Sequence, residues 1–127
     1  MISSMDKVIS WFEIPALDLG RARAFYETLF GVSLLEHIDG PQVMAVFPYN
    51  RETSTGGCIL FGPGYKPSPE GSVVYLHTEP NLDTVLGRVA EAGGSIAKPR
   101  TELPPGMGAY AQIIDTEGNR VGLYGTN

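Results

Sequence analysis

The feature that most constrains this chain is an internal repeat with an offset of 63 residues. Asp18 and Gly31 bound one amphipathic segment, and Asn81 and Gly94 bound another with the same separation of 13 residues. Side-chain oxygens of Asp and Asn accept the free amide hydrogens at a helix start, and glycine readily adopts the left-handed conformation at a helix end. Because the offset is half of the 127 residues, the chain is predicted to be a duplication.

The segments around the two helices predict the same order of elements in each half. Runs rich in β-branched and aromatic residues favour strands. The predicted strands are 7–14, 32–38, 43–48 and 57–62 in the first half, and 73–79, 95–101, 109–115 and 119–124 in the second. The predicted buried helix faces are Leu19, Ala22, Tyr26 and Leu29 in the first half, and Leu82, Val85, Leu86 and Val89 in the second. We therefore expect one α+β domain, with a first βαβββ module over about 6–62, a linker over 63–71 and a second module over about 72–125.

Three stretches carry a resemblance to a known family: FEIPALDLGRARAFYETLFG, VYLHTEPNLDTVLGRVAEAGG and YAQIIDTEGNRVGLY. They resemble the glyoxalase, bleomycin-resistance and extradiol-dioxygenase superfamily, also called vicinal oxygen chelate proteins, and within it the small proteins related to lactoylglutathione lyase. The resemblance implies two tandem βαβββ modules that enclose a shared cleft, often with a dimer partner, so we expect a homodimer. It implies a place for a site and not a particular reaction.

The metal-dependent members of this superfamily hold one divalent ion with side chains from strands of both modules. The resemblance places one ligand seven residues before each helix cap, at Trp11 and Val74, and another at Gly122. In the last strand of the first module, Cys58 is the only possible donor. Trp11, Val74 and Gly122 cannot ligate a metal, so we expect neither the family metal nor another cofactor.

Glu13 is an acidic residue inside an apolar predicted strand. Strand side chains alternate between faces, so Trp11 and Glu13 share a face, which the resemblance turns toward the cleft. Two interpretations stay open. Glu13 is either a structural group paired with an arginine, for which Arg120 is our preferred partner, or a catalytic general base or ligand anchor.

The same alternation predicts that Val74, Leu76 and Thr78 face the cleft and that His77 lies on the opposite face. Cys58 is expected to be a buried, inert thiol, and His37 a solvated loop residue. The segment 100–108 is either a lid or a plain surface loop. The predicted ligand-binding residues are Trp11, Glu13, Leu60, Val74, Leu76, Tyr110, Arg120 and Tyr124.

Composition narrows the partners of this chain. With 9 basic and 14 acidic residues the net charge is -5, which provides no basic surface for nucleic acid or an anionic membrane. No apolar run approaches the roughly 18 residues of a membrane span. The start MISSMDK lacks the pattern of a signal peptide, so a cytoplasmic location is expected.

Three classes of function remain open from the sequence. The first is a metal-independent protein that binds a small organic molecule in its cleft. The second is a lyase, isomerase or dioxygenase of the kind found in the resembling superfamily, which either works without the usual ion or recruits one elsewhere. The third is a non-catalytic interaction module. The missing metal ligands favour the first class.

Overall fold

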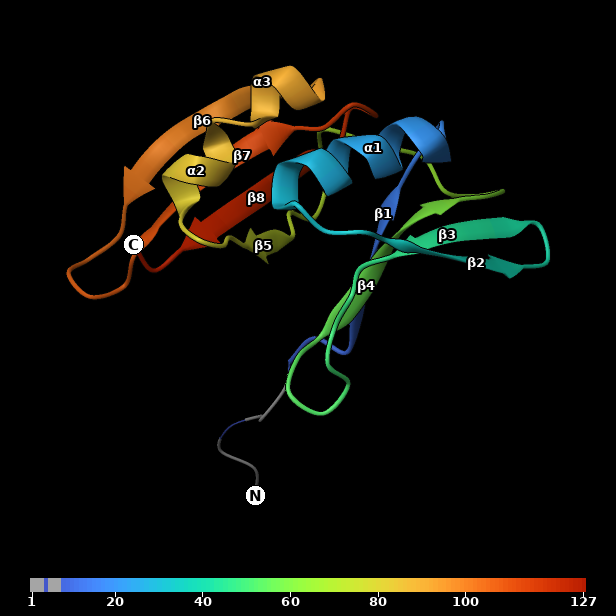
Figure 1. The fold of residues 1–127 in the computed structure, drawn as a ribbon, viewed down its shortest axis with the longest axis horizontal. Helices are drawn as coiled ribbons and strands as arrows, with labels where there is room; N and C mark the ends of the chain where they lie inside the picture. Colours follow the sequence, from blue (N-terminus) through green and yellow to red (C-terminus); the bar gives the residue numbers. More distant parts are fainter. Residues whose placement is uncertain (1–3, 5–7) are drawn as a thin grey trace.

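The computed structural model describes residue 4 and residues 8–127, and its elements follow the predicted order twice (Figure 1). The first module comprises β1 (Trp11–Pro15), α1 (Leu19–Phe30), β2 (Leu35–Asp39), β3 (Gln42–Val46) and β4 (Gly56–Phe61). The second comprises β5 (Tyr75–His77), α2 (Leu82–Leu86), α3 (Val89–Ala92), β6 (Ser95–Glu102), β7 (Ala109–Ile114) and β8 (Arg120–Gly125). The α+β class and the two βαβββ modules are confirmed. The predicted starts of the first module and of its first strand, at residues 6 and 7, lie outside the described residues.

Each module forms a four-stranded sheet with the same strand order, β1-β4-β3-β2 in the first and β5-β8-β7-β6 in the second. The first strand of each module pairs in parallel with the last, and the other pairs are antiparallel. As a result β1 and β5 are both edge strands. The helices cover one face of the sheets: α1 contacts β3 and β4, and α2 and α3 contact β6 (Figure 1). We call the face without helices the open face of each sheet.

The helix boundaries largely follow the predicted capping residues. Asp18 Oδ1 accepts a hydrogen bond from the Arg21 amide at 3.0 Å, and Asn81 Oδ1 accepts one from the Thr84 amide at 2.8 Å. The left-handed residues at the two ends are Gly31, with φ of 66°, and Gly93, with φ of 107°. The single second helix of the prediction is wrong, because the chain forms two short helices that are interrupted at Gly87, a poor helix former.

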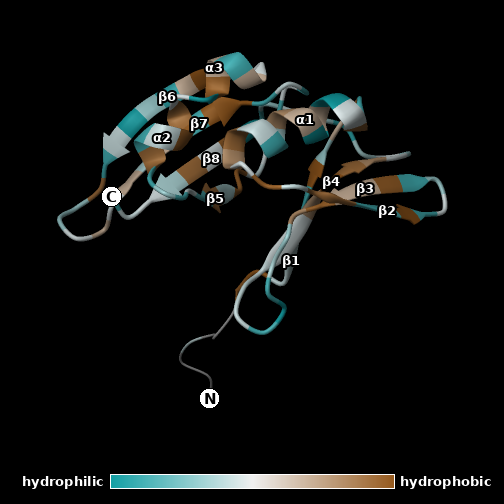
Figure 2. Ribbon diagram, viewed as in Figure 1, coloured by the Kyte–Doolittle hydropathy of each residue, from teal (hydrophilic) through white to brown (hydrophobic). Residues whose placement is uncertain are grey.

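One apolar core lies between the helices and the sheets and draws on both modules. Phe25 and Leu29 of α1 belong to the same cluster as Val89, Ile113 and Leu123 of the second module. Figure 2 shows this as hydrophobic colouring along the central strands and on parts of the helices. The predicted helix faces agree with this core: all of their residues are buried except Leu19 and Leu86, which are half-buried and pack against it.

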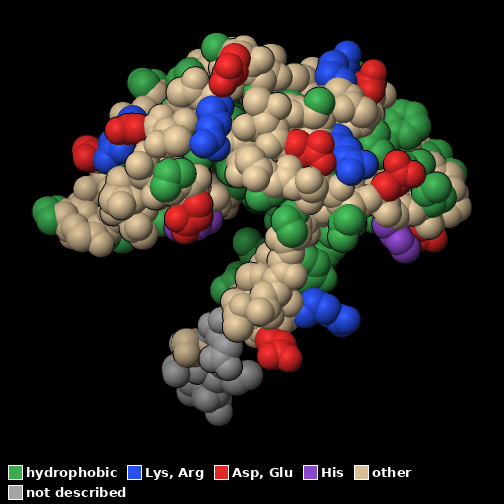
Figure 3. Space-filling model, in the orientation of Figure 1, with side chains coloured by type: hydrophobic (Ala, Val, Ile, Leu, Met, Phe, Trp, Pro, Cys, Tyr) green, Lys and Arg blue, Asp and Glu red, His purple; other side chains and the backbone are tan. Residues whose placement is uncertain are grey.

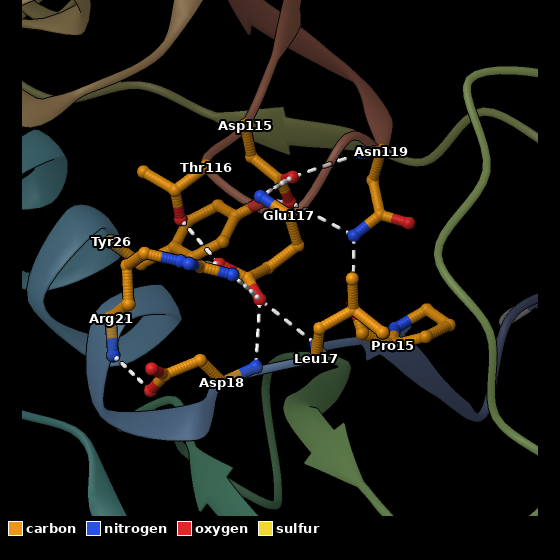
Figure 4. A network of polar contacts seen from close by, with 9 residues as sticks. All are labelled: Pro15, Leu17, Asp18, Arg21, Tyr26, Asp115, Thr116, Glu117 and Asn119. Carbon is orange, nitrogen blue, oxygen red and sulfur yellow. Dashed lines mark hydrogen bonds and ion pairs between the residues drawn. The ribbon is translucent and has the colours of Figure 1, made fainter.

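The turn between β7 and β8 joins the second module to the start of α1 (Figure 4). Glu117 Oε1 accepts hydrogen bonds from the amides of Leu17 and Asp18, both at 2.8 Å, and Arg21 Nε donates to Oε2 at 2.7 Å. Burial raises the pKa of the Glu117 carboxyl, but Arg21, the two amides and the Thr116 hydroxyl outweigh burial and lower this pKa to about 2. Glu117 is therefore a structural anion between the modules.

Two further residues of this turn complete the network in Figure 4. The Tyr26 hydroxyl donates to Asp115 Oδ2 at 2.6 Å, and Asn119 Nδ2 donates to the Pro15 carbonyl at 2.7 Å. Burial and the neighbouring Asp115 raise the pKa of Tyr26 well above its ordinary value. Within the described residues every buried polar side-chain atom has a hydrogen-bond partner. The network thus holds the modules together, and each of its buried polar side-chain atoms has a partner within the protein.

Candidate functional site

A pocket of about 330 Å³ opens between the two modules. In Figure 3 the molecule is hollowed below α1, between the second module and the lower part of β1 and β4, and hydrophobic side chains line the recess. The first module supplies the end of α1, one side chain of β1 and the segment between β3 and β4, and the second supplies the edge strand β5. The lining residues are Phe12, Phe30, Val32, Phe47, Pro48, Tyr49, Ser54, Thr55, Leu76, His77 and Glu79.

The walls of the pocket are mainly aromatic. The rings of Phe12 and Phe47 lie 5.7 Å apart and tilted, and those of Phe30 and Phe47 lie 6.3 Å apart and nearly perpendicular. Glycine in β4 makes this arrangement possible, because a Cβ at Gly57 would come within 2.3 Å of the Phe12 ring. The strand pairing places Phe12 directly beside Gly57, so the ring lies over bare backbone.

The mouth of the pocket is polar. His77 Nε2 lies 3.0 Å from Glu79 Oε1, and both side chains are largely exposed. The hydroxyl of Thr55 donates to the Ile9 carbonyl at 2.9 Å, and that of Ser54 donates to the Asn50 carbonyl at 2.9 Å. An apolar wall with a few polar groups is the usual composition of a small-molecule site.

The predicted orientation of the strand in the second module is wrong. Leu76 packs against the core and Thr78 is buried, so these two side chains point toward the helix side of the sheet. Tyr75 and His77 occupy the open face instead. Leu76 still contributes to the aromatic pocket, at the edge of the sheet, and Val74 lines a smaller pocket described below.

The cause is a difference of one residue in the connection between strand and helix. In the first module β1 ends at Pro15, and the cap Asp18 follows three positions later. In the second module β5 ends at His77, and the cap Asn81 follows four positions later. The offset of 63 residues therefore holds for the helix caps and fails in the strands. Because side chains alternate, a shift of one residue exchanges the two faces.

Glu13 and Arg120 both line a second, small pocket of about 60 Å³, together with Val74. The predicted pair between them is nevertheless wrong. Arg120 donates to Gln112 Oε1 at 3.1 Å and to the Pro69 carbonyl at 3.2 Å. Gln112 lies on the neighbouring strand β7, and Pro69 belongs to the linker that passes beside β8. The Arg120 guanidinium therefore bonds to these two acceptors and not to Glu13. Among the described residues the ion pairs do not include Glu13, which is exposed on the open face with Trp11.

The other predicted residues of β7 and β8 lie on the open face of the second sheet. The Tyr110 hydroxyl accepts a hydrogen bond from Lys98, whose ammonium lies 4.7 Å from the Tyr110 ring centre. The Tyr124 hydroxyl donates to the Met107 carbonyl at 2.6 Å, which ties the loop before β7 to β8. This hydrogen bond fixes the hairpin loop to β8. Tyr110 and Tyr124 are not among the residues that line the aromatic pocket.

Two residues of β4 that the sequence analysis singled out are inaccessible to a ligand. Leu60 and Cys58 are both fully buried. Burial, with Glu13 adding to it, raises the pKa of the Cys58 thiol to about 12, so the thiolate is scarce at neutral pH. The prediction of a buried thiol is confirmed. His37 is exposed, but it lies within β2 and not in a loop.

The residues at the expected ligand positions do not fit the metal centre of the resembling family. On the second sheet the position opposite Gly122 is Tyr75, and its hydroxyl accepts a hydrogen bond from Gln112. A Cβ at Gly122 would lie 2.2 Å from the Tyr75 ring, so this ring fills the space of the missing side chain. Trp11 occupies the corresponding face of β1. Within residues 4 and 8–127 no group of three His, Cys, Asp or Glu side chains is placed to hold a metal ion.

A duplicated βαβββ architecture with a pocket between its modules defines a two-module α+β protein of the glyoxalase type. The sequence model of the Glyoxalase/Bleomycin resistance protein/Dioxygenase superfamily matches residues 8–123, which is nearly the whole chain. The chain therefore belongs to this superfamily. No curated protein matches the sequence.

Solved structures agree on the fold. Glyoxalase I from Zea mays is similar with a TM-score of 0.67 and 20% identity over 92% of this chain, which spans 45% of the maize chain. UcmS2 is similar with a TM-score of 0.66 and 23% identity, covering 94% of this chain and 98% of its own. A glyoxalase/bleomycin resistance protein/dioxygenase family enzyme from Burkholderia phytofirmans PsJN has a TM-score of 0.65 and 16% identity, with coverages of 93% and 98%. At these identities the likeness concerns the fold alone.

Sequence reasoning missed most of the pocket. Its lining residues Phe30, Phe47, Tyr49 and Glu79 were not among the predicted ligand-binding residues, and His77 was assigned to the far side of the sheet. The available signal was the glycine pair at 56 and 57, because adjacent glycines inside an apolar strand indicate that large rings pack on the backbone there.

None of the helices in the described part of the chain is long and apolar enough to cross a membrane.

Proposed function

We propose that this protein binds a small organic molecule in the aromatic pocket between its modules, and that it does so without a metal ion. The observation that carries the proposal is the pocket itself, whose volume of about 330 Å³ lies within the usual range for ligand sites of roughly 300–1,000 Å³. Its aromatic walls supply apolar surface, and the polar groups at its mouth provide orientation. The mismatch at the family's ligand positions supports a metal-independent mode of binding.

Screening by thermal shift tests the proposal. A ligand that binds only the folded state raises the free energy of unfolding by about 2.7 kcal/mol at a concentration one hundred times its Kd. We expect a panel of small metabolites and aromatic compounds to contain molecules that raise the Tm in this way.

A variant that fills the pocket links any such ligand to this site. Val32 lines the pocket and is only half-buried, so Val32→Phe adds a ring in the available space. We expect Val32→Phe to fold and to lose at least tenfold in ligand affinity. Ile38→Phe is the matched control, because Ile38 is exposed on β2 and does not line the pocket. Equal affinity of both variants for the ligand would place binding elsewhere and contradict the proposal.

Elemental analysis tests the metal-independent part. Protein purified without chelator is expected to hold well under one equivalent of zinc, nickel, manganese or iron, and its ligand affinity is expected to survive dialysis against EDTA. A stoichiometric metal whose removal abolishes binding would contradict this part of the proposal.

A second candidate function is favoured by one observation, the pair of His77 and Glu79 at the pocket mouth. A histidine oriented by a carboxylate can act as a general base, as in an isomerase that removes a proton from a substrate carbon. If so, a ligand found by the screen should exchange one carbon-bound hydrogen with deuterium from the solvent, and His77→Gln should stop the exchange. If no bound ligand exchanges hydrogen, the isomerase candidate is wrong and only the binding function stands.

A further inference from the structure

Three polar groups that line the aromatic pocket present hydrogen-bond acceptors: the Ser54 hydroxyl, the Thr55 hydroxyl and the Glu79 carboxylate. The Ser54 hydroxyl donates its hydrogen bond to the Asn50 carbonyl, and the Thr55 hydroxyl donates to the Ile9 carbonyl, both at 2.9 Å. The Ser54 oxygen also accepts a hydrogen bond from the Asn50 amide at 3.2 Å, so it has one lone pair left for a ligand. Each hydroxyl can therefore accept from a ligand, but its hydrogen is already engaged. Glu79 adds a carboxylate whose side chain is 78% exposed. A ligand group that bonds to Ser54, Thr55 or Glu79 must therefore be a donor.

The charge around the pocket has one sign. Glu79 is the only lining residue with a permanent charge, and no lysine or arginine occurs among the lining residues, all of which the structure describes. The side chain beside Glu79 is His77, which meets the carboxylate at 3.0 Å. The chain as a whole carries a net charge of -5. An anionic ligand would thus face a carboxylate with no basic lining residue to receive it.

The walls favour a cation as well. Phe12, Phe30, Phe47 and Tyr49 line the same space, and the face of an aromatic ring attracts an ammonium group within about 6 Å. This attraction grows where water is displaced, as in a half-buried aromatic recess.

We infer that the ligand of this pocket is an organic cation, with an apolar or aromatic body between the rings and a protonated amine or quaternary ammonium at the mouth, facing Glu79. The inference rests on the proposed function and names the class of ligand for the same site. The body is held by burial of apolar surface, and the charge is selected by Glu79, the hydroxyl lone pairs and the rings.

Three probes with the same body test this inference: 4-phenylbutylamine, 4-phenyl-1-butanol and 4-phenylbutyrate, which are cationic, neutral and anionic at pH 7.5. Their affinities are measured by calorimetry at low salt. We expect the amine to bind at least tenfold more tightly than the alcohol, and the butyrate to bind most weakly. Raising the salt concentration should weaken the amine and leave the alcohol unchanged, because only the charged probe is screened.

Glu79→Gln removes the charge and keeps the shape of an exposed side chain. The amine is expected to lose about tenfold in affinity for this variant, while the alcohol keeps its affinity. Glu91→Gln is the matched control, since Glu91 is an exposed acid on α3 that does not line the pocket, and it should leave both affinities unchanged.

The outcomes separate the ligand class from the binding function. Equal binding of all three probes, preference for the butyrate, or an unchanged amine affinity in Glu79→Gln would overturn the cationic class while binding in the pocket stands. Failure of all three probes to bind would also overturn the class. The proposed function falls only if Val32→Phe fails to weaken the ligands found by the wider screen.

Discussion

At the scale of single residues, glycines decide where the aromatic rings of this protein lie. Phe12 packs over Gly57 and Tyr75 packs over Gly122, in each module on the strand that runs parallel to the glycine's own strand. The rings point to different sides, Phe12 into the pocket and Tyr75 onto the open face. The same device thus builds the pocket wall in one module and fills an expected ligand position in the other.

Gly57→Ala tests the role of the pocket-side glycine. The added Cβ would lie 2.3 Å from the Phe12 ring, so the ring must move toward the pocket. We expect a loss of about 1–3 kcal/mol in the free energy of unfolding, as for other overpacked sites, together with weaker ligand binding. Urea denaturation measures the first effect. Gly20→Ala is the control, because its Cβ would make only an ordinary contact in a helix, and unchanged stability in Gly57→Ala would refute the account of the wall.

Glu117 makes stability depend on acidity. Its pKa is about 2 in the folded protein against an ordinary value of 4.5, so its contribution is complete above pH 4.5 and is lost as the pH falls toward 2. The shift corresponds to about 3 kcal/mol. We expect Glu117→Gln to be less stable than the wild type at pH 7, and the difference to shrink between pH 4.5 and 2. Denaturation curves at several pH values measure this, and a constant difference would contradict it.

At the scale of elements, the two modules repeat their helices more faithfully than their strands. The strand-to-helix connection is one residue longer in the second module, which exchanges the faces of β5. The second helix also divides at Gly87, where the first continues unbroken. Both departures arise at connections, where a single residue changes the direction of the chain.

The interruption at Gly87 gives a prediction for the second helix. Gly87 has a right-handed conformation with φ of -65°, and a Cβ there would make only ordinary contacts. Alanine is favoured over glycine by up to about 1 kcal/mol in such a conformation, so Gly87→Ala is expected to stabilise the protein. Gly93→Ala is expected to do the opposite, because Gly93 has φ of 107° and its Cβ would lie 3.0 Å from Thr116. Thermal denaturation of the two variants compares them, and a destabilised Gly87→Ala would show that the break is required.

At the scale of the whole molecule, two kinds of contact join the modules: the continuous apolar core and the polar network of the β7–β8 turn. The pocket lies at the same junction, so a ligand bound there as proposed would contact both modules. The open faces of the sheets leave apolar side chains exposed, among them Trp11, Leu35 and Tyr75. Exposed apolar surface of this kind is typical of association sites.

A homodimer remains a prediction for this chain. Size-exclusion chromatography with light scattering should give a mass of about twice the 13.7 kDa of one chain. Trp11→Lys places a charge on the open face of the first sheet, and we expect it to shift the protein toward the monomer if this face is buried between copies. A monomeric wild type at micromolar concentration would contradict the prediction.

The sequence by itself determined the order of the elements, the capping residues and the buried helix faces, because caps, glycine terminators and apolar periodicity act over a few neighbouring residues. The tertiary structure alone decided which face of β5 is buried, what Arg120 contacts and where the pocket lies. These depend on one residue in a connection and on which rings meet across the module boundary. Phe12, Phe47 and Leu76 are far apart in the chain, and only the packing of the two modules on one core brings them to the same pocket.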